Sequence, residues 1–159
     1  MLNTFKLRGL ITSFMTIVSL FAIYANDYDK GWSEFNNNNR VEARKYFQQA
    51  INNSDTKAKA YLSLSLLDWS EYRFDDAFVS FTKFYDTSDN PYPYLYAMYS
   101  LPFMNQFKVL SKAELTFWEK VVEDPKMNGT LKAMIYSKLG DHYQACTNTK
   151  KSKELFSKM

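Results

Sequence analysis

The sequence has very little of the residues that cross-link a chain or form tight turns. Its 159 residues include one cysteine, one histidine, four glycines and four prolines. A single cysteine excludes an internal disulfide framework, and so few glycines and prolines do not suit the many tight turns of an all-β fold. Hydrophobic residues make up 46% of the chain and aromatic residues 18%, unlike the composition of disordered chains. We therefore expect one folded domain or short solenoid that is rich in helix.

Sequence patterns that carry catalysis or phosphate binding are also missing. The chain has no glycine-rich phosphate loop, no serine nucleophile elbow and no zinc-finger spacing. His142 and Cys146 lie four positions apart, a spacing that could begin a metal or thiol site. There is no second histidine or cysteine to complete it, so we interpret Cys146 as a small buried residue and His142 as its half-exposed neighbour. The sequence thus predicts no catalytic residue, no metal and no cofactor, and a protein that is not an enzyme.

The N-terminal segment, residues 1–25, has the pattern of a secretory signal peptide. Lys6 and Arg8 precede an apolar run over residues 10–23, and the small residue Ala25 stands just before polar residues. The run is shorter than the roughly 20 residues of a membrane-spanning helix, which favours cleavage over anchoring. We expect a mature chain of residues 26–159 in the periplasm or outside the cell. Without Lys6 and Arg8 its formal charge is about +1, which gives no electrostatic reason for a nucleic-acid partner.

One spacing recurs in the chain. The interval from Ala43 to Ala77 equals the interval from Phe47 to Phe81, which indicates a repeat period of about 34 residues. Within each pair the small residue and the aromatic residue are four positions apart, which places them on one helical face, one turn from each other. In both segments a helical apolar pattern, a polar break and a second helical pattern follow one another. The spacing predicts repeated pairs of helices.

Two further segments follow the pattern more loosely. The third keeps the spacing from Ala113 to Phe117, although Pro102 interrupts its first helix, and the fourth has Ser152 where the others have alanine. We expect nine residues to pack the layers between helices: Ala43, Phe47, Ala77, Phe81, Ala113, Phe117, Gly140, Tyr143 and Phe156.

Together these positions resemble the tetratricopeptide repeat family over residues 27–159. The resemblance implies an all-α fold of antiparallel helix pairs stacked as a right-handed solenoid, with repeats at about 27–55, 57–90, 91–126 and 130–159. It also implies a scaffold that binds a protein or a peptide. No capping helix follows Phe156, so we expect this end to pack on a further domain or subunit, or the chain to continue. Residues 119–133 are similar to exported bacterial repeat segments that precede transglutaminase-like domains, without a catalytic set of that kind.

In the tetratricopeptide family the first helix of each pair lines a concave groove. Transferring those positions to this sequence gives a partner-binding groove made of Tyr28, Trp32, Phe35, Leu62, Leu66, Trp69 and Gln144. Such a groove suits an extended or a helical peptide. The alternative is that Trp32 and Trp69 pack against a neighbouring helix.

Two other functions stay open at this point. The chain could be the non-catalytic N-terminal module of a larger exported enzyme. It could also bind sugars or an envelope polymer through the tyrosines of residues 92–99, because tyrosine offers amphipathic contact area. For that stretch the alternative is a helix started by Pro91 or Pro93 whose tyrosines pack in the core.

Overall fold

The computed structural model describes residues 27–100 and 108–159, which form helices and turns with no strand among them. A first helix covers residues 27–36. The helices that follow are α2 (Arg40–Ala50), α3 (Ser54–Ser70), α4 (Phe74–Thr87), α5 (Tyr92–Tyr99), α6 (Lys112–Val122), α7 (Gly129–Ala145) and α8 (Thr149–Phe156). This part of the chain is all-α, as the sequence predicted. The expected signal at residues 1–25 and the expected break at Pro102 lie outside the described residues.

Local sequence explains where several helices begin. The side chains of Asn53, Ser111, Asn128 and Asn148 each accept a hydrogen bond from a backbone N–H in the first turn of the helix that follows. These caps satisfy donors that have no partner inside a helix. The helix α4 instead carries two acids in its first turn, whose charge complements the helix dipole.

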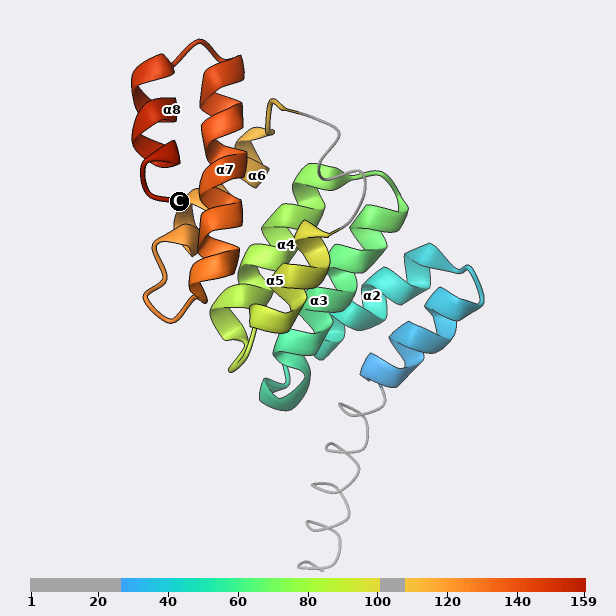
Figure 1. Cartoon of the computed structure of the whole chain (residues 1–159). Helices are drawn as coiled ribbons and strands as arrows, with labels where there is room; N and C mark the ends of the chain where they lie inside the picture. Colours follow the sequence, from blue (N-terminus) through green and yellow to red (C-terminus); the bar gives the residue numbers. More distant parts are fainter. Residues whose placement is uncertain (1–26, 101–107) are drawn as a thin grey trace, which may run out of the picture.

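Consecutive helices pack along one another as hairpins. The closest packing is between α3 and α4 and between α7 and α8, and α2 packs on α3, α4 on α6, and α6 on α7. Figure 1 shows the helices arranged from residues 27–36 and α2 at one end to α7 and α8 at the other, with α5 lying across α3 and α4. The helix α5 therefore lies against the single hairpin formed by α3 and α4.

The same turn recurs between the two helices of three hairpins. Asn38, Tyr72 and Thr147 adopt left-handed backbone conformations, with φ of 62°, 60° and 61°. In each case the next backbone N–H donates to the carbonyl oxygen five positions earlier, at 2.8 to 2.9 Å. This is the bond of a Schellman motif, which satisfies a carbonyl at the end of the first helix and reverses the chain. Each of these residues stands nine positions before a phenylalanine, namely Phe47, Phe81 and Phe156.

Each of those phenylalanines follows a small residue of the preceding helix by 16 positions. A Cβ added at Gly31 would lie 2.5 Å from Cε1 of Phe47, and one added at Gly140 would lie 2.5 Å from Cε1 of Phe156. Ser65 stands at the corresponding position before Phe81 and is buried, and its hydroxyl donates to the carbonyl oxygen of Ala77 at 3.0 Å. Small residues at these positions let the two helices of a hairpin approach closely.

The expected packing residues occupy the core with different degrees of burial. The alanines and phenylalanines at 43, 47, 77, 81 and 117 are buried, as are Gly140 and Ser152, whereas Ala113 and Tyr143 are half-buried. The ring of Phe117 lies within 5.3 Å of Phe81 and 4.9 Å of Trp118, measured between centroids. Phe156 keeps 36% of its surface exposed. The main core therefore centres on α4 and α6.

A buried carboxylate fixes α2 against α3 and α4. Asp68 is 2% exposed, and its Oδ1 lies 2.7 Å from Nη2 of Arg44. Its Oδ2 accepts a hydrogen bond from the hydroxyl of Ser80 at 3.4 Å, and Arg44 also pairs with Glu71 at 2.6 Å. A charge buried this deeply needs such partners, so these residues specify how the three helices meet.

Candidate binding site between α3 and α5

Three of the residues predicted for the groove come together on α3. Leu62, Leu66 and Trp69 follow one another at steps of four and three positions, which places them on one helical face. They line a pocket of about 170 Å³. The other residues that line it are Ser65, Phe81, Tyr94, Ala97 and Met98. The pocket thus joins the predicted face of α3 to the helix α5.

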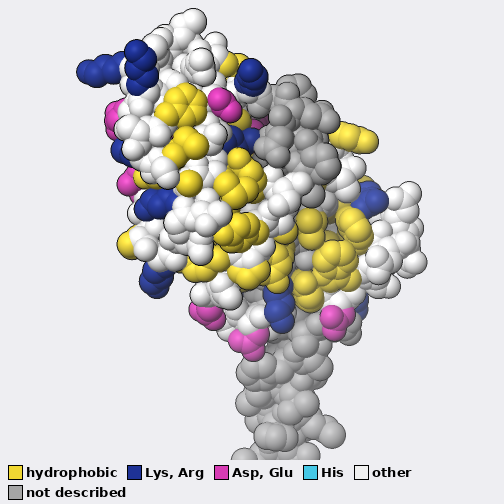
Figure 2. Space-filling model, in the orientation of Figure 1, with side chains coloured by type: hydrophobic (Ala, Val, Ile, Leu, Met, Phe, Trp, Pro, Cys, Tyr) yellow, Lys and Arg dark blue, Asp and Glu magenta, His cyan; other side chains and the backbone are white. Residues whose placement is uncertain are grey.

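The pocket is apolar and has an exposed mouth. Leu66 keeps 43% and Tyr94 45% of their surface exposed, whereas Met98 is buried at 4%. The ring of Tyr94 packs edge-on against Phe84, with centroids 5.1 Å apart. Figure 2 shows hydrophobic side chains gathered on this face over α3 and α5, with most of the charged side chains toward its edges. Such a surface favours an apolar group over a charged one.

Trp69, which lines the pocket, is held by aromatic contacts with the helix α4. Its ring lies 5.5 Å from Phe78 and 5.0 Å from Phe74, between centroids. Phe74 in turn contacts Tyr72, which is 81% exposed at the turn between α3 and α4. The indole is half-buried, so it both packs on the neighbouring α4 and lines the pocket. The two interpretations of Trp69 are therefore compatible.

The remaining predicted groove residues lie elsewhere. Tyr28, Trp32 and Phe35 surround Phe47 in a separate cluster, with Trp32 and Phe47 centroids 5.6 Å apart. This is the neighbour-packing arrangement that was the alternative for Trp32. Gln144 is exposed near the end of α7 and does not line the pocket between α3 and α5.

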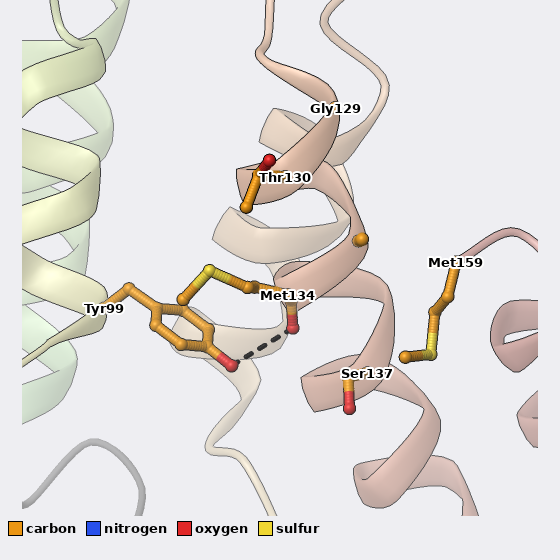
Figure 3. Close-up of a pocket in the computed structure, with 7 residues that line it drawn as sticks. Tyr99, Gly129, Thr130, Met134, Ser137 and Met159 are labelled. Atoms are coloured by element: carbon orange, nitrogen blue, oxygen red, sulfur yellow. Dashed lines mark hydrogen bonds between the residues drawn. The ribbon is translucent and has the colours of Figure 1, made fainter.

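A second, more open groove lies between α5 and α7. It has a volume of about 600 Å³ and is shown in Figure 3. Small side chains of α7 form much of its floor, and Tyr99 and Met134 meet at its side, where the Tyr99 hydroxyl donates to the Met134 carbonyl oxygen at 3.1 Å. The lining residues are Tyr99, Gly129, Thr130, Ala133, Met134, Ser137 and Met159. The helix α5 therefore has a cavity on each side.

The tyrosine-rich stretch forms the helix α5, with Pro93 in its first turn. Tyr92 and Tyr99 are half-buried, whereas Tyr94 and Tyr96 are exposed. The hydroxyls of Tyr92 and Tyr85 both donate to the carboxylate of Asp124, just after α6. The hydrogen bond from Tyr85, with those from the backbone of Lys126 and from Tyr92, holds the pKa of Asp124 below its usual range. Two of the four tyrosines of α5, Tyr92 and Tyr99, therefore pack against the rest of the protein.

The structure corrects the expectation for His142 and Cys146. His142 is buried at 6% exposure, and its Nδ1 accepts a hydrogen bond from the backbone N–H of Leu110 at 3.0 Å. Cys146, the residue that caps the end of α7, is exposed, and its Sγ lies 3.9 Å from Nε2 of His142. In the described ranges no group of three or more histidine, cysteine or acidic residues could hold a metal ion. The imidazole of His142 therefore acts as the hydrogen-bond acceptor for a backbone N–H just before α6.

Sequence reasoning missed Gly31, Ala97 and Met98, and it offered Tyr94 for a polymer-binding site and not for this pocket. Gly31 could have been found, because its separation from Phe47 equals that of Gly140 from Phe156. Ala97 and Met98 had no comparable signal, because the third segment departs most from the repeat spacing.

None of the helices in residues 27–100 and 108–159 combines the length and the apolar character that crossing a membrane requires. Comparisons of the chain with models of known protein families, with curated proteins and with solved structures found no match.

Proposed function

We propose that this protein is an exported scaffold of the tetratricopeptide type that binds a peptide segment of another protein in the pocket between α3 and α5. Three observations support a repeat of this type. The first and second hairpins share one alanine-to-phenylalanine pattern at equal intervals, three turns share one hydrogen-bond pattern, and three phenylalanines follow a small residue by 16 positions. The stacking of the hairpins as a right-handed solenoid is part of the proposal.

The observation that carries the binding role is the apolar pocket beside exposed Leu66 and Tyr94. Its volume of about 170 Å³ is close to that of an engineered apolar cavity of about 150 Å³ that holds one benzene molecule. Sites for whole small molecules are commonly about 300–1,000 Å³. One aliphatic or aromatic side chain therefore suits this pocket, and a peptide that presents such a side chain is the ligand that we propose. The proposed role is binding rather than catalysis.

The test is selection of peptides on the mature chain, residues 26–159. A displayed library of short random peptides is selected on the immobilised protein, and the enriched sequences are measured by fluorescence anisotropy. We expect enriched peptides to share one large apolar residue and to lose at least tenfold in affinity on Leu66→Lys or Ala97→Trp. Lysine would place a charge at the mouth, and tryptophan would fill it.

Val79→Lys is the matched control for this experiment. Val79 lies on α4, is 49% exposed and does not line the α3–α5 pocket, so it resembles Leu66 in exposure but not in location. Binding that falls equally with Val79→Lys would place the peptide elsewhere. A library that yields no enriched peptide would count against the binding role itself.

A further inference from the structure

The helix α5 forms one wall of the pocket and is too short to be stable by itself. It has eight residues, whereas isolated helices shorter than about 12–15 residues are marginal in water. Leu95 and Met98 are buried in the core and hold one face of α5. Tyr94, Ala97 and Met98 line the pocket. The size of the pocket therefore depends on where its contacts hold α5.

Three tyrosines on one face of α5 bond to the segment that joins α6 and α7, or to α7 itself. Tyr92, Tyr96 and Tyr99 are spaced by four and three positions, so they share a face. Their hydroxyls contact Asp124 Oδ2 at 3.0 Å, Asn128 Oδ1 at 3.4 Å and the Met134 carbonyl oxygen at 3.1 Å, respectively. One face of α5 is thus bonded toward α6 and α7 while Tyr94 lines the pocket toward α3.

The two shorter bonds stand at the two ends of the helix. Tyr92 is the first residue of α5 and Tyr99 the last. A bond at each end fixes the direction of a short helix as well as its distance from its neighbour. The bond to Asp124 joins a phenol to a carboxylate, a stronger kind of hydrogen bond than one between neutral groups. Burial and this carboxylate raise the pKa of Tyr92, so its hydroxyl keeps the proton that it donates.

We propose that the hydroxyls of Tyr92 and Tyr99 position α5 and thereby set the width of the pocket between α3 and α5. They are positioning residues, since they act on the pocket through α5 and do not line it themselves. The identity of the occupant, a peptide side chain, rests on the proposed function, whereas the positioning can be tested without it. If α5 is held in this position, the pocket cannot widen. Its ligand must then be a side chain that fits a volume of about 170 Å³.

The experiment compares Tyr92→Phe, Tyr99→Phe and the double variant with the parent chain. Each change removes one hydroxyl and keeps the ring. Tyr143→Phe is the matched control, because the Tyr143 hydroxyl donates to Glu119 at 2.5 Å between α7 and α6, at a site that does not line the pocket. Two measurements are made on the mature chain: hydrogen exchange of the α5 amides, and binding of benzene followed by the methyl signal of Met98.

In the double variant we expect α5 amides to exchange about tenfold faster, from loss of two hydrogen bonds, and benzene binding to weaken at least fivefold. In Tyr143→Phe both measurements stay within twofold of the parent. Unchanged exchange, unchanged benzene binding, or equal effects in Tyr143→Phe would each overturn the proposal. Because benzene replaces the natural partner, a peptide selection that fails removes the proposed function and leaves this test intact.

Discussion

Gly31 lies directly against the ring of Phe47, so that a Cβ at residue 31 would stand 2.5 Å from Cε1 of that ring. The phenylalanine is fully buried and is the centre of the aromatic cluster between the helix of residues 27–36 and α2. The first hairpin therefore closes around a contact that only glycine allows without a shift. Gly140 and Phe156 repeat the contact in the last hairpin.

We expect Gly31→Ala to destabilise the protein in spite of the higher helix propensity of alanine. The added methyl group must displace a buried ring, and overpacking of this kind costs about 1–3 kcal/mol. The matched control is Gly129→Ala, because a Cβ at Gly129 meets nothing within 4 Å. Urea denaturation followed by circular dichroism should show a lower midpoint for Gly31→Ala alone. Equal denaturation midpoints for the two variants would contradict the claim that Phe47 leaves no room for a side chain at residue 31.

Removal of Arg44 should leave the buried carboxylate of Asp68 with only one more distant cation, Arg73, whose Nη1 lies 3.8 Å from Oδ1 of Asp68. We expect Arg44→Met to lower the free energy of unfolding by about 2–4 kcal/mol, since breaking a buried ion pair is strongly destabilising. The exposed pair of Lys120 and Asp86 is the control, with side chains 44% and 47% exposed. There Lys120→Met should cost about 0–1 kcal/mol. The double variant Arg44→Met with Asp68→Leu should recover part of the lost free energy of unfolding. If it recovers none, the buried charge of Asp68 is not the cause of the destabilisation.

Acid should weaken the attachment of α5 through Asp124. The pKa of this carboxyl lies below its usual range, chiefly because Tyr85 donates a hydrogen bond to it. A carboxyl whose pKa is lower in the folded state contributes stability above its unfolded pKa, and this stability is lost as the pH falls through the folded pKa. We therefore expect stability to fall below about pH 4. Thermal melts at decreasing pH should show a shallower fall for Asp124→Asn than for exposed Asp89→Asn, and equal slopes would contradict this role.

His142 should act as a structural acceptor. Because its Nδ1 accepts from the Leu110 N–H, we expect the ring to carry its proton on Nε2, and NMR can read this directly from the single histidine. His142→Leu removes the acceptor and should cost about 1–3 kcal/mol, the usual penalty for a buried unsatisfied donor. Cys146→Ala should change stability by no more than about 0.5 kcal/mol, because this side chain is exposed. A ring proton found on Nδ1 would contradict the assignment.

Much of the local structure could be predicted from the sequence. The common face of Leu62, Leu66 and Trp69 follows from helical spacing alone, and the helix starts at Asn53 and Asn128 follow from capping chemistry. The spacing between Phe47 and Phe81 indicated where two hairpins pack. The left-handed turn residues were harder to predict. Asparagine, as at Asn38, often adopts that conformation, but tyrosine and threonine, as at Tyr72 and Thr147, rarely do. Their common distance from a phenylalanine was the available signal.

The sequence by itself determined the all-α class and the face of α3 that meets the pocket, because periodicity and caps are local properties. Only the tertiary structure decided that Tyr94, Ala97 and Met98 form the opposite wall. The placement of α5 depends on bonds from Tyr92 and Tyr99 to groups 32 and 35 positions away, which no local pattern records. The tertiary structure also decided that His142 is buried and Cys146 exposed. A spacing of four positions predicts that the two residues share a helical face, but it does not predict how deeply each is buried. Burial depends on what the rest of the chain places against that face.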